Sequence, residues 1–151
     1  MVPTVGEETA ASRLIALPTW QLSRAAACSH QILHERLQSV GFAGYEFRVL
    51  AAVGDARTLS QADVGRRAEL DRRDVALTVR ELEARGLIER APDPAHRQRK
   101  LVSLTGLGKT ALTDLERDLA DVQREVFGSL SEAELSALLG YLARLGGLGL
   151  Q

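Results

Sequence analysis

The chain has few of the residues that cross-link a protein or anchor it in a membrane. Its 151 residues include one cysteine, four prolines and one methionine, and only 4% are aromatic. A single cysteine excludes an intramolecular disulfide and a Cys-x-x-Cys metal site. No segment reaches the roughly 18 consecutive apolar residues of a membrane span, and no basic segment followed by an apolar one opens the chain. We therefore expect a cytoplasmic protein with no membrane partner.

Residue spacings typical of enzymes are also missing. The Gly106–Lys109 segment lacks the spacing of a phosphate-binding loop, and no nucleophile–base pair or carboxylate pair is indicated by spacing. His30 and His34, with Glu35 nearby, have the i, i+4 spacing that can present two imidazoles to a metal. No further ligand cluster accompanies them. We expect no enzyme, no metal and no cofactor, and histidines that are exposed or lie at an interface.

Residues 60–105 carry the strongest pattern, which predicts two short helices followed by a basic β-hairpin. The second helix is expected to begin at Asp71, an N-cap residue with Asp74 three positions later, and to end at Gly86. Between them, apolar residues at steps of four and three form a stripe that must pack on a core. This stripe consists of Val75, Val79 and Leu82.

The opposite face of the predicted second helix carries arginines together with small or apolar residues. Arginine can form forked hydrogen bonds with guanine edges, and apolar side chains can contact thymine methyl groups, so this face suits a DNA major groove. An ordinary solvated helix face is the alternative for any single arginine. The face comprises Arg72, Arg73, Ala76, Leu77 and Arg80, with Asp74 at its flank.

After Gly86 the pattern predicts a hairpin. Leu87–Arg90 is a short strand, Ala91–His96 is a proline-containing turn, and Arg97–Leu104 is a returning strand. Arg97, Arg99 and Lys100 load the returning strand near its tip, where arginine can reach phosphates or a minor groove. The alternative is a charged edge hairpin that only prevents sheet aggregation.

Four segments carry a family resemblance: the run from Leu70 to Gly86, the Arg85–Ile88 junction, the Asp93–Pro94 turn and the Leu101–Thr105 strand. Together they resemble the MarR family of bacterial transcriptional regulators. The resemblance covers nearly the whole chain. It implies a mainly α-helical fold with a small β-wing, in which a winged helix-turn-helix is flanked by N- and C-terminal dimerisation helices. It also implies a homodimer that reads a palindromic operator in double-stranded DNA, with a repressor expected rather than an activator.

The resemblance assigns roles to individual residues. Asp71 to Arg85 would be the recognition helix, Arg97 would enter the minor groove, and Asp93 would brace the wing turn against Arg97 or Arg99. His96 departs from the acidic residue that many members carry there, which bears on the ion pairs of the wing tip. Ser60 and Gln61 would start the supporting helix near the DNA backbone. The predicted DNA-binding residues are Ser60, Gln61, Arg72, Arg73, Asp74, Ala76, Leu77, Arg80, Arg97 and Arg99.

The charge distribution supports DNA binding despite a net charge of -1. Residues 66–100 hold ten Lys or Arg and seven Asp or Glu, for a net +3, whereas residues 1–65 and 101–151 carry -1 and -3. A basic middle between acidic ends would let a dimer approach DNA in one orientation. Phosphate contacts should make that binding steeply salt-dependent.

The flanking segments are predicted to hold two DNA readers about 34 Å apart, one turn of B-DNA. Thr105 is a predicted N-cap, and Ser131 with Glu134 forms a capping box for the last helix. Leucines and valines at steps of three and four run from Leu112 to Val126. The predicted organisation is a flexible arm at 1–12 and a single domain at 13–151, with a winged core at about 45–104 and dimerisation helices at about 13–40 and 105–147.

Two further features bear on regulation. Trp20, Tyr45 and Phe47 lie near where the first helices should meet the winged core, and the resemblance implies a pocket for a small aromatic effector there; plain core is the alternative. Cys28 could serve as a redox sensor, but its alanine neighbours favour a small core or interface cysteine. A ligand or oxidant would act by shifting the spacing between the two readers. The competing function is a winged interaction module without DNA binding.

Overall fold

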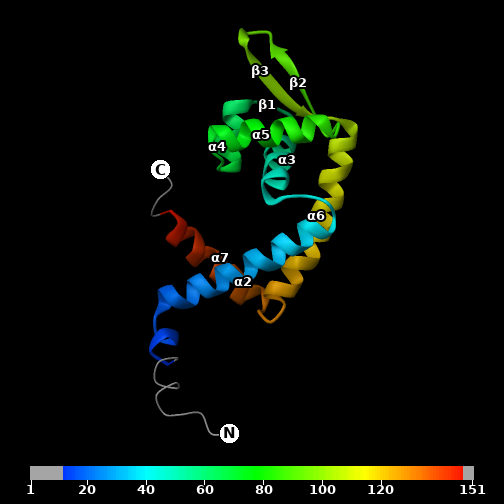
Figure 1. Cartoon of the computed structure of the whole chain (residues 1–151). Coiled ribbons are helices and arrows are strands. Elements are labelled where there is room, and N and C mark those ends of the chain that lie inside the picture. Colours follow the sequence, from blue (N-terminus) through cyan, green and yellow to red (C-terminus); the bar gives the residue numbers. More distant parts are fainter. Residues whose placement is uncertain (1–11, 148–151) are drawn as a thin grey trace.

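The computed structural model describes residues 12–147, so the predicted arm at 1–12 lies outside the described residues except for Ser12 (Figure 1). The chain forms a winged domain at one end and an extended set of helices at the other. The elements, in order, are α2 (Pro18–Ser39), α3 (Gly44–Ala56), β1 (Thr58–Ser60), α4 (Gln61–Ala68), α5 (Arg72–Ala84), β2 (Ile88–Asp93), β3 (His96–Leu104), α6 (Gly106–Phe127) and α7 (Glu132–Gly146).

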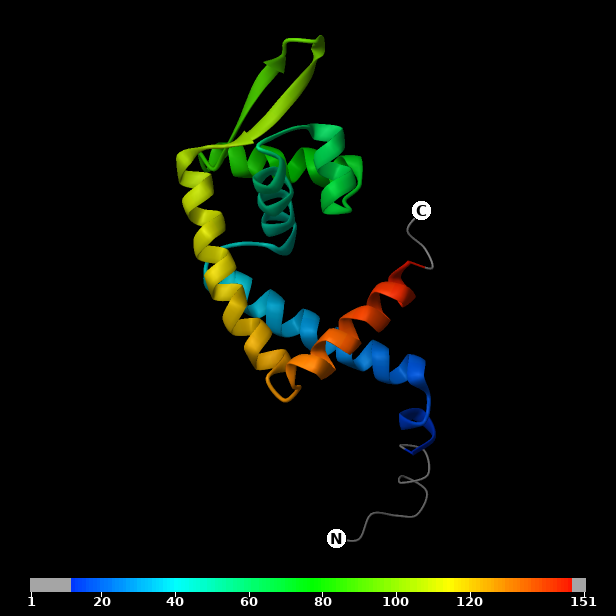
Figure 2. The ribbon, with the colours of Figure 1, turned by 180° about the vertical axis from the view of Figure 1, so that it is seen from behind.

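The winged domain comprises α3 to β3, and α6 runs from the base of the wing away from this domain, as both views show (Figures 1 and 2). Helix α2 packs on α6, and the β2–β3 hairpin projects at the opposite end of the molecule. This is the expected mainly α-helical architecture with a small β-wing between flanking helices.

The predicted helix boundaries are confirmed by their caps. Side-chain oxygens of Asp71, Thr105 and Ser131 each accept a hydrogen bond from the backbone N–H three residues on, at 2.8, 3.0 and 3.2 Å. Each cap of this kind is worth about 1 kcal/mol. At the other end of α5, Gly86 has φ +72°, the left-handed conformation that glycine adopts without strain.

The three-stranded antiparallel sheet has the order β1-β3-β2. The prediction of a turn spanning Ala91–His96 was wrong, because Ala91 pairs with Leu101 and Pro92 with Lys100 within the hairpin. Pro92 is tolerated since β2 is an edge strand, where a missing N–H costs no ladder hydrogen bond. Strand β1 was not predicted, because it has only three residues and so shows no detectable periodicity.

The core lies inside the winged domain and continues along α6. The predicted stripe of α5 is confirmed, because Val75, Val79 and Leu82 are all at most 2% exposed. The α6 stripe is also confirmed by buried Leu115, Leu119 and Val122. On α2, Leu37 is buried but Val40 is 37% exposed, since the helix ends at Ser39 and Val40 only caps it.

Candidate nucleic-acid interface

The outer face of α5 presents the predicted side chains to solvent. Arg72, Arg73 and Arg80 are exposed, and Leu77 is 55% exposed although it is a large apolar residue. Asp74 and Ala76 are half-buried at the flanks. This arrangement follows from the buried stripe, because one face of an amphipathic helix fixed in a core leaves the opposite face free. The face therefore combines cationic and apolar groups available to a partner.

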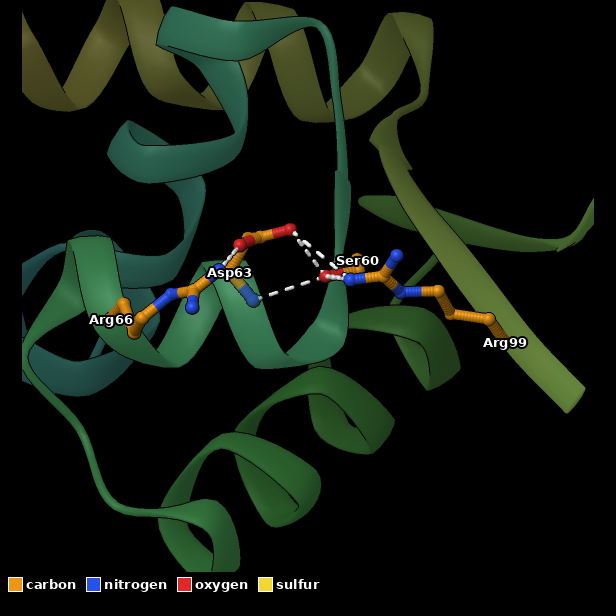
Figure 3. A network of polar contacts seen from close by, with 4 residues as sticks. All are labelled: Ser60, Asp63, Arg66 and Arg99. Carbon is orange, nitrogen blue, oxygen red and sulfur yellow. Dashed lines mark hydrogen bonds and ion pairs between the residues drawn. The ribbon is translucent and has the colours of Figure 1, made fainter. Parts of the chain in front are cut away.

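The end of β1 and the start of α4 are held by a polar network that uses Ser60 (Figure 3). Ser60 is 4% exposed, and its hydroxyl donates to Asp63 Oδ2 at 2.5 Å while it accepts from Asp63 N at 3.2 Å. Arg66, one turn further along α4, pairs with the other oxygen of Asp63. Ser60 thus acts as the N-cap of α4, with its hydroxyl engaged inside the protein, and Gln61 beside it is half-buried.

Arg99 joins the same network from the wing. Its Nη2 donates to Ser60 Oγ at 3.3 Å and lies 3.8 Å from Asp63 Oδ2 (Figure 3). The side chain therefore ties β3 to the first turn of α4. The sequence predicted Arg99 as a DNA contact and did not indicate a role for Asp63. Arg99 lies 36 residues after Asp63 and 39 after Ser60, and no local pattern links residues so far apart.

The wing turn is braced differently from the prediction. Asp93 Oδ1 accepts a hydrogen bond from the backbone N–H of Ala95 at 2.9 Å, a side-chain turn of the kind that aspartate commonly makes. Within residues 12–147, Asp93 forms no ion pair with Arg97 or Arg99. Arg97 and His96 are both exposed at the tip. Asp93 braces the turn through the backbone, so its carboxylate does not hold the guanidinium of Arg97.

A cavity of about 710 Å³ lies between α4, α5 and β3. Four cationic side chains, and no acidic one, are among the residues that line it. These four are Arg66, Arg72, Arg99 and Lys100. Two helices and a wing strand thus converge on a positively charged groove, which α5 lines with Arg72 and Val75. Such a groove attracts phosphate groups, and its attraction weakens with salt.

The aromatic residues predicted to line an effector pocket are not brought together within one chain. Trp20, 39% exposed, lies near the start of α2, whereas Tyr45, 46% exposed, lies in the first turn of α3. The helix from Trp20 to Ser39 spans about 28 Å at 1.5 Å per residue. Phe47 is half-buried and packs against the core. None of the three lines the cavity between α4, α5 and β3 or a second cavity between α3, β3 and α6.

The other side chains weighed from the sequence lie on the surface. Cys28 is exposed on α2, as is its neighbour Ala26, so of the predicted core or interface position the core is wrong and the interface stays a prediction. His30 and His34 are both exposed. Among residues 12–147 there is no group of three His, Cys, Asp or Glu residues that could hold a metal ion. In the same range no helix is both long and apolar enough to cross a membrane.

Two ion pairs at the C-terminal end of α5 were missed from the sequence. Arg90 Nη2 on β2 lies 2.5 Å from Glu83 Oε2, and Arg85 Nη1 lies 2.8 Å from Glu46 Oε1 on α3. The hydrogen bond from Arg90 lowers the pKa of the Glu83 carboxyl below its usual value of 4.5. These contacts anchor the end of α5 to the wing and to the start of α3.

A helix-turn-helix whose second helix exposes arginines, followed by a two-stranded wing over a cationic groove, defines a winged-helix protein of the DNA-binding type. Residues 40–99 match the sequence model of the MarR family. Similar proteins of known structure share the whole architecture, including the flanking helices. The winged part of the chain, residues 40–99, is that of the MarR family.

Individual relatives share about a quarter to a third of the sequence. Over 99 residues the chain is 31% identical to the transcriptional repressor NicR of Pseudomonas putida, a match that covers 66% of this chain and 62% of NicR. Bordetella bronchiseptica BpsR, whose DNA binding is regulated by 6-hydroxynicotinic acid, is 27% identical, with a TM-score of 0.75 over 83% of this chain and 96% of BpsR. Streptomyces coelicolor PcaV with its natural ligand is 25% identical, with a TM-score of 0.77 over 97% and 98%.

The chain spans only about three fifths of the length of the curated relatives that it matches, between 60% and 64%.

Proposed function

We propose that this protein is a transcriptional regulator that binds a palindromic operator as a homodimer. The observation that carries the proposal is the exposed face of α5, where Leu77 is 55% exposed between Arg73 and Arg80, on the same helix whose first turn contributes Arg72 to the cationic groove. A solvated helix gains nothing from a large apolar side chain between arginines, whereas a major groove offers it thymine methyl groups. In this proposal Arg73, Leu77 and Arg80 meet base edges and Arg97 enters the minor groove.

The homodimer is supported by apolar surface that the single chain leaves uncovered. No residue of α7 is buried, and this helix exposes large apolar side chains, among them Leu139, Tyr141 and Leu145. The segment from Leu14 to Leu22 exposes five more. Large apolar side chains gathered on an exposed helix face mark an interaction site. A second copy that covers it would fix the distance between the two α5 helices.

Repression and release by a small aromatic ligand are the finer parts of the proposal. NicR is a repressor, BpsR responds to 6-hydroxynicotinic acid, and PcaV has a natural ligand, so relatives offer precedents for both. A pocket that uses Trp20 and Tyr45 together would have to be completed by the second protomer, since α2 separates them in one chain. Titration of Trp20 fluorescence with phenolic and hydroxypyridine carboxylates tests this, and a flat response at millimolar ligand counts against it.

Selection from a pool of random duplexes tests the DNA-binding proposal whatever the sequence of the operator. The protein is expected to enrich an inverted repeat with half-site centres one helical turn apart. The paired substitution Arg73→Ala and Arg80→Ala should abolish the enrichment while circular dichroism and thermal unfolding remain near those of the wild type, because both side chains are exposed. Enrichment of no common sequence by the wild type would contradict the proposal and favour a winged interaction module.

A further inference from the structure

The end of the recognition helix is the place where the winged domain meets both helices that leave it. Arg85, directly after α5, reaches the loop between α2 and α3. Thr105, directly before α6, donates its hydroxyl to Gly86 O at 2.6 Å and its backbone N–H to Leu87 O at 3.1 Å. Three consecutive residues therefore contact both connections between the DNA reader and the rest of the chain.

Arg85 makes three contacts with the start of α3 and the loop before it. Its Nη1 donates to Glu46 Oε1 at 2.8 Å, its Nη2 donates to Gly41 O at 3.2 Å, and its guanidinium carbon lies 4.3 Å from the centroid of the Phe42 ring. A planar guanidinium can serve a carboxylate, a carbonyl and a ring face together, whereas a single ammonium cannot. We call Arg85, Glu46, Gly41 and Phe42 the Arg85 cluster.

Burial of Glu46 makes its ion pair with Arg85 costly to break. Its side chain is 10% exposed, and its second oxygen accepts from Ala43 N at 2.8 Å, which fixes the first turn of α3. A buried carboxylate that loses its cationic partner leaves an uncompensated charge, so the pair resists separation. The segment that joins α2 to α3 is only Val40–Ala43, and the contacts of Arg85 fall on two of these four residues.

From this geometry we propose that Arg85 is a positioning residue for operator binding. It fixes the angle between α5 and α2, and through α2 the separation of the two α5 helices in the dimer. The proposal rests on the proposed function above. It predicts that the Arg85 cluster determines which half-site spacing the dimer accepts, rather than how strongly one reader holds one half-site.

Spacer dependence measures this role directly. The duplex enriched by the wild type is remade with one base pair added or removed between half-sites, and as a single half-site. We expect the wild type to prefer its own spacing by at least about tenfold, and Arg85→Ala and Glu46→Gln to reduce that preference to about twofold, with single half-site affinity unchanged within about twofold. The spacing preference of Arg85→Lys should lie between those of the wild type and Arg85→Ala, because one ammonium cannot contact Glu46, Gly41 and Phe42 together.

The matched control is Arg90→Ala. It removes an ion pair from the same last turns of α5, but to β2 of the wing instead of to the α2–α3 loop. It should lower stability and leave the spacing preference intact. The proposal is overturned if Arg85→Ala keeps the wild-type preference, or if Arg90→Ala loses the preference to the same extent.

A readout without DNA separates this proposal from the proposed function. A spin label at Leu77→Cys in a Cys28→Ser background reports the distance between the two α5 helices. We expect one narrow distance distribution with Arg85 present, a broader one in Arg85→Ala, and no broadening in Arg90→Ala. Equal widths, or no distance between labels at all, overturn the positioning role. If the wild type enriches no DNA sequence, the proposed regulatory function is refuted. The label distances then test only whether Arg85 fixes the separation of the two α5 helices.

Discussion

The two wing arginines, Arg97 and Arg99, look equivalent in the sequence but differ in their contact with Asp63. Arg99 is held by Asp63 and Ser60, whereas Arg97 forms no ion pair within residues 12–147 and is exposed at the wing tip. The pairing fixes the Arg99 side chain toward α4, whereas the side chain of Arg97 is not held by an acidic partner in the described part of the chain. The two residues are therefore expected to act differently: Arg99 keeps the wing against α4, and Arg97 contacts DNA.

Arg97→Ala should weaken operator binding and lower the slope of log affinity against log salt by about one unit, because a cation that enters the minor groove also neutralises about one backbone phosphate. Anisotropy titrations at four salt concentrations measure both quantities. Arg117→Ala is the control, because Arg117 is exposed on α6 and its one ion pair among residues 12–147 is with Asp114, one turn away. Unchanged affinity and slope in Arg97→Ala would remove the wing tip from the DNA interface.

The Glu83–Arg90 pair should give the fold a pH dependence in the acid range. The pKa of Glu83 is lowered in the folded chain by its hydrogen bond from Arg90. A carboxyl with a lowered folded pKa binds protons more readily when unfolded, so its stabilisation is present above 4.5 and is lost as pH falls below that value. Because Glu83 is 37% exposed, the pair is worth about 1 kcal/mol or less.

Urea unfolding of the wild type and of Glu83→Gln measures this contribution. The wild type should be the more stable protein at pH 7, and the difference in unfolding free energy should shrink as pH is lowered below 4.5. The other carboxyl groups titrate in both proteins, so their contributions cancel in the difference in unfolding free energy. A difference that stays constant through the acid range would show that Glu83 is not stabilised by Arg90.

At the scale of elements, the start of α6 packs unusually close to the end of α5. A Cβ on Gly108 would lie 1.8 Å from Leu87 O, a backbone atom that cannot move aside cheaply. The same approach lets Thr105 cap α6 and bind Gly86 O together. The absence of a side chain at Gly108 therefore holds α6 against the base of the wing.

Gly108→Ala should destabilise the fold by about 3 kcal/mol, at the upper end of the usual cost of overpacking. Gly106→Ala is the matched control, since it lies two residues earlier in the same helix and a Cβ there meets nothing within 4 Å. It should be neutral or stabilising by up to about 1 kcal/mol, because alanine favours helix over glycine. Equal midpoints of thermal unfolding for the two variants would contradict this packing.

The elements also show what could be predicted from sequence. Helices α5, α6 and α7 were predicted with their caps, because side-chain capping and apolar periodicity are local signals that span three or four residues. The strand β1 and the extra hairpin pairs at Ala91 and Pro92 were not, since strand pairing depends on a distant partner. For the same reason the exposed face of α5 was predicted, but the ion pairs of Arg85, Arg90 and Arg99 required the structure.

At the scale of the whole molecule, apolar surface and positive charge lie at different ends. The large exposed apolar residues of α7 and of Leu14–Leu22 belong to the helices away from the wing (Figure 1), whereas the net +3 of residues 66–100 belongs mainly to the winged domain. A second copy placed on the apolar end would leave both basic readers exposed. This division of the surface suits a dimer that binds DNA through both winged domains.

Leu139→Asp should convert the dimer into a monomer at micromolar concentration, because it introduces a charge into the proposed interface. Operator affinity should then fall, since single half-sites no longer bind together. Leu107→Asp is the matched control: Leu107 is 60% exposed, against 54% for Leu139, but lies in the first turn of α6 beside the wing. Light scattering after size exclusion would contradict the account if both variants kept the wild-type mass.

The most direct test of operator binding is an anisotropy titration of the purified protein against the intergenic DNA upstream of its own gene. It is carried out at two salt concentrations, with unrelated duplex as competitor. The account predicts tight binding of one dimer per site that resists the competitor and weakens steeply with salt. Binding at low salt that is no stronger than to the unrelated duplex would contradict it.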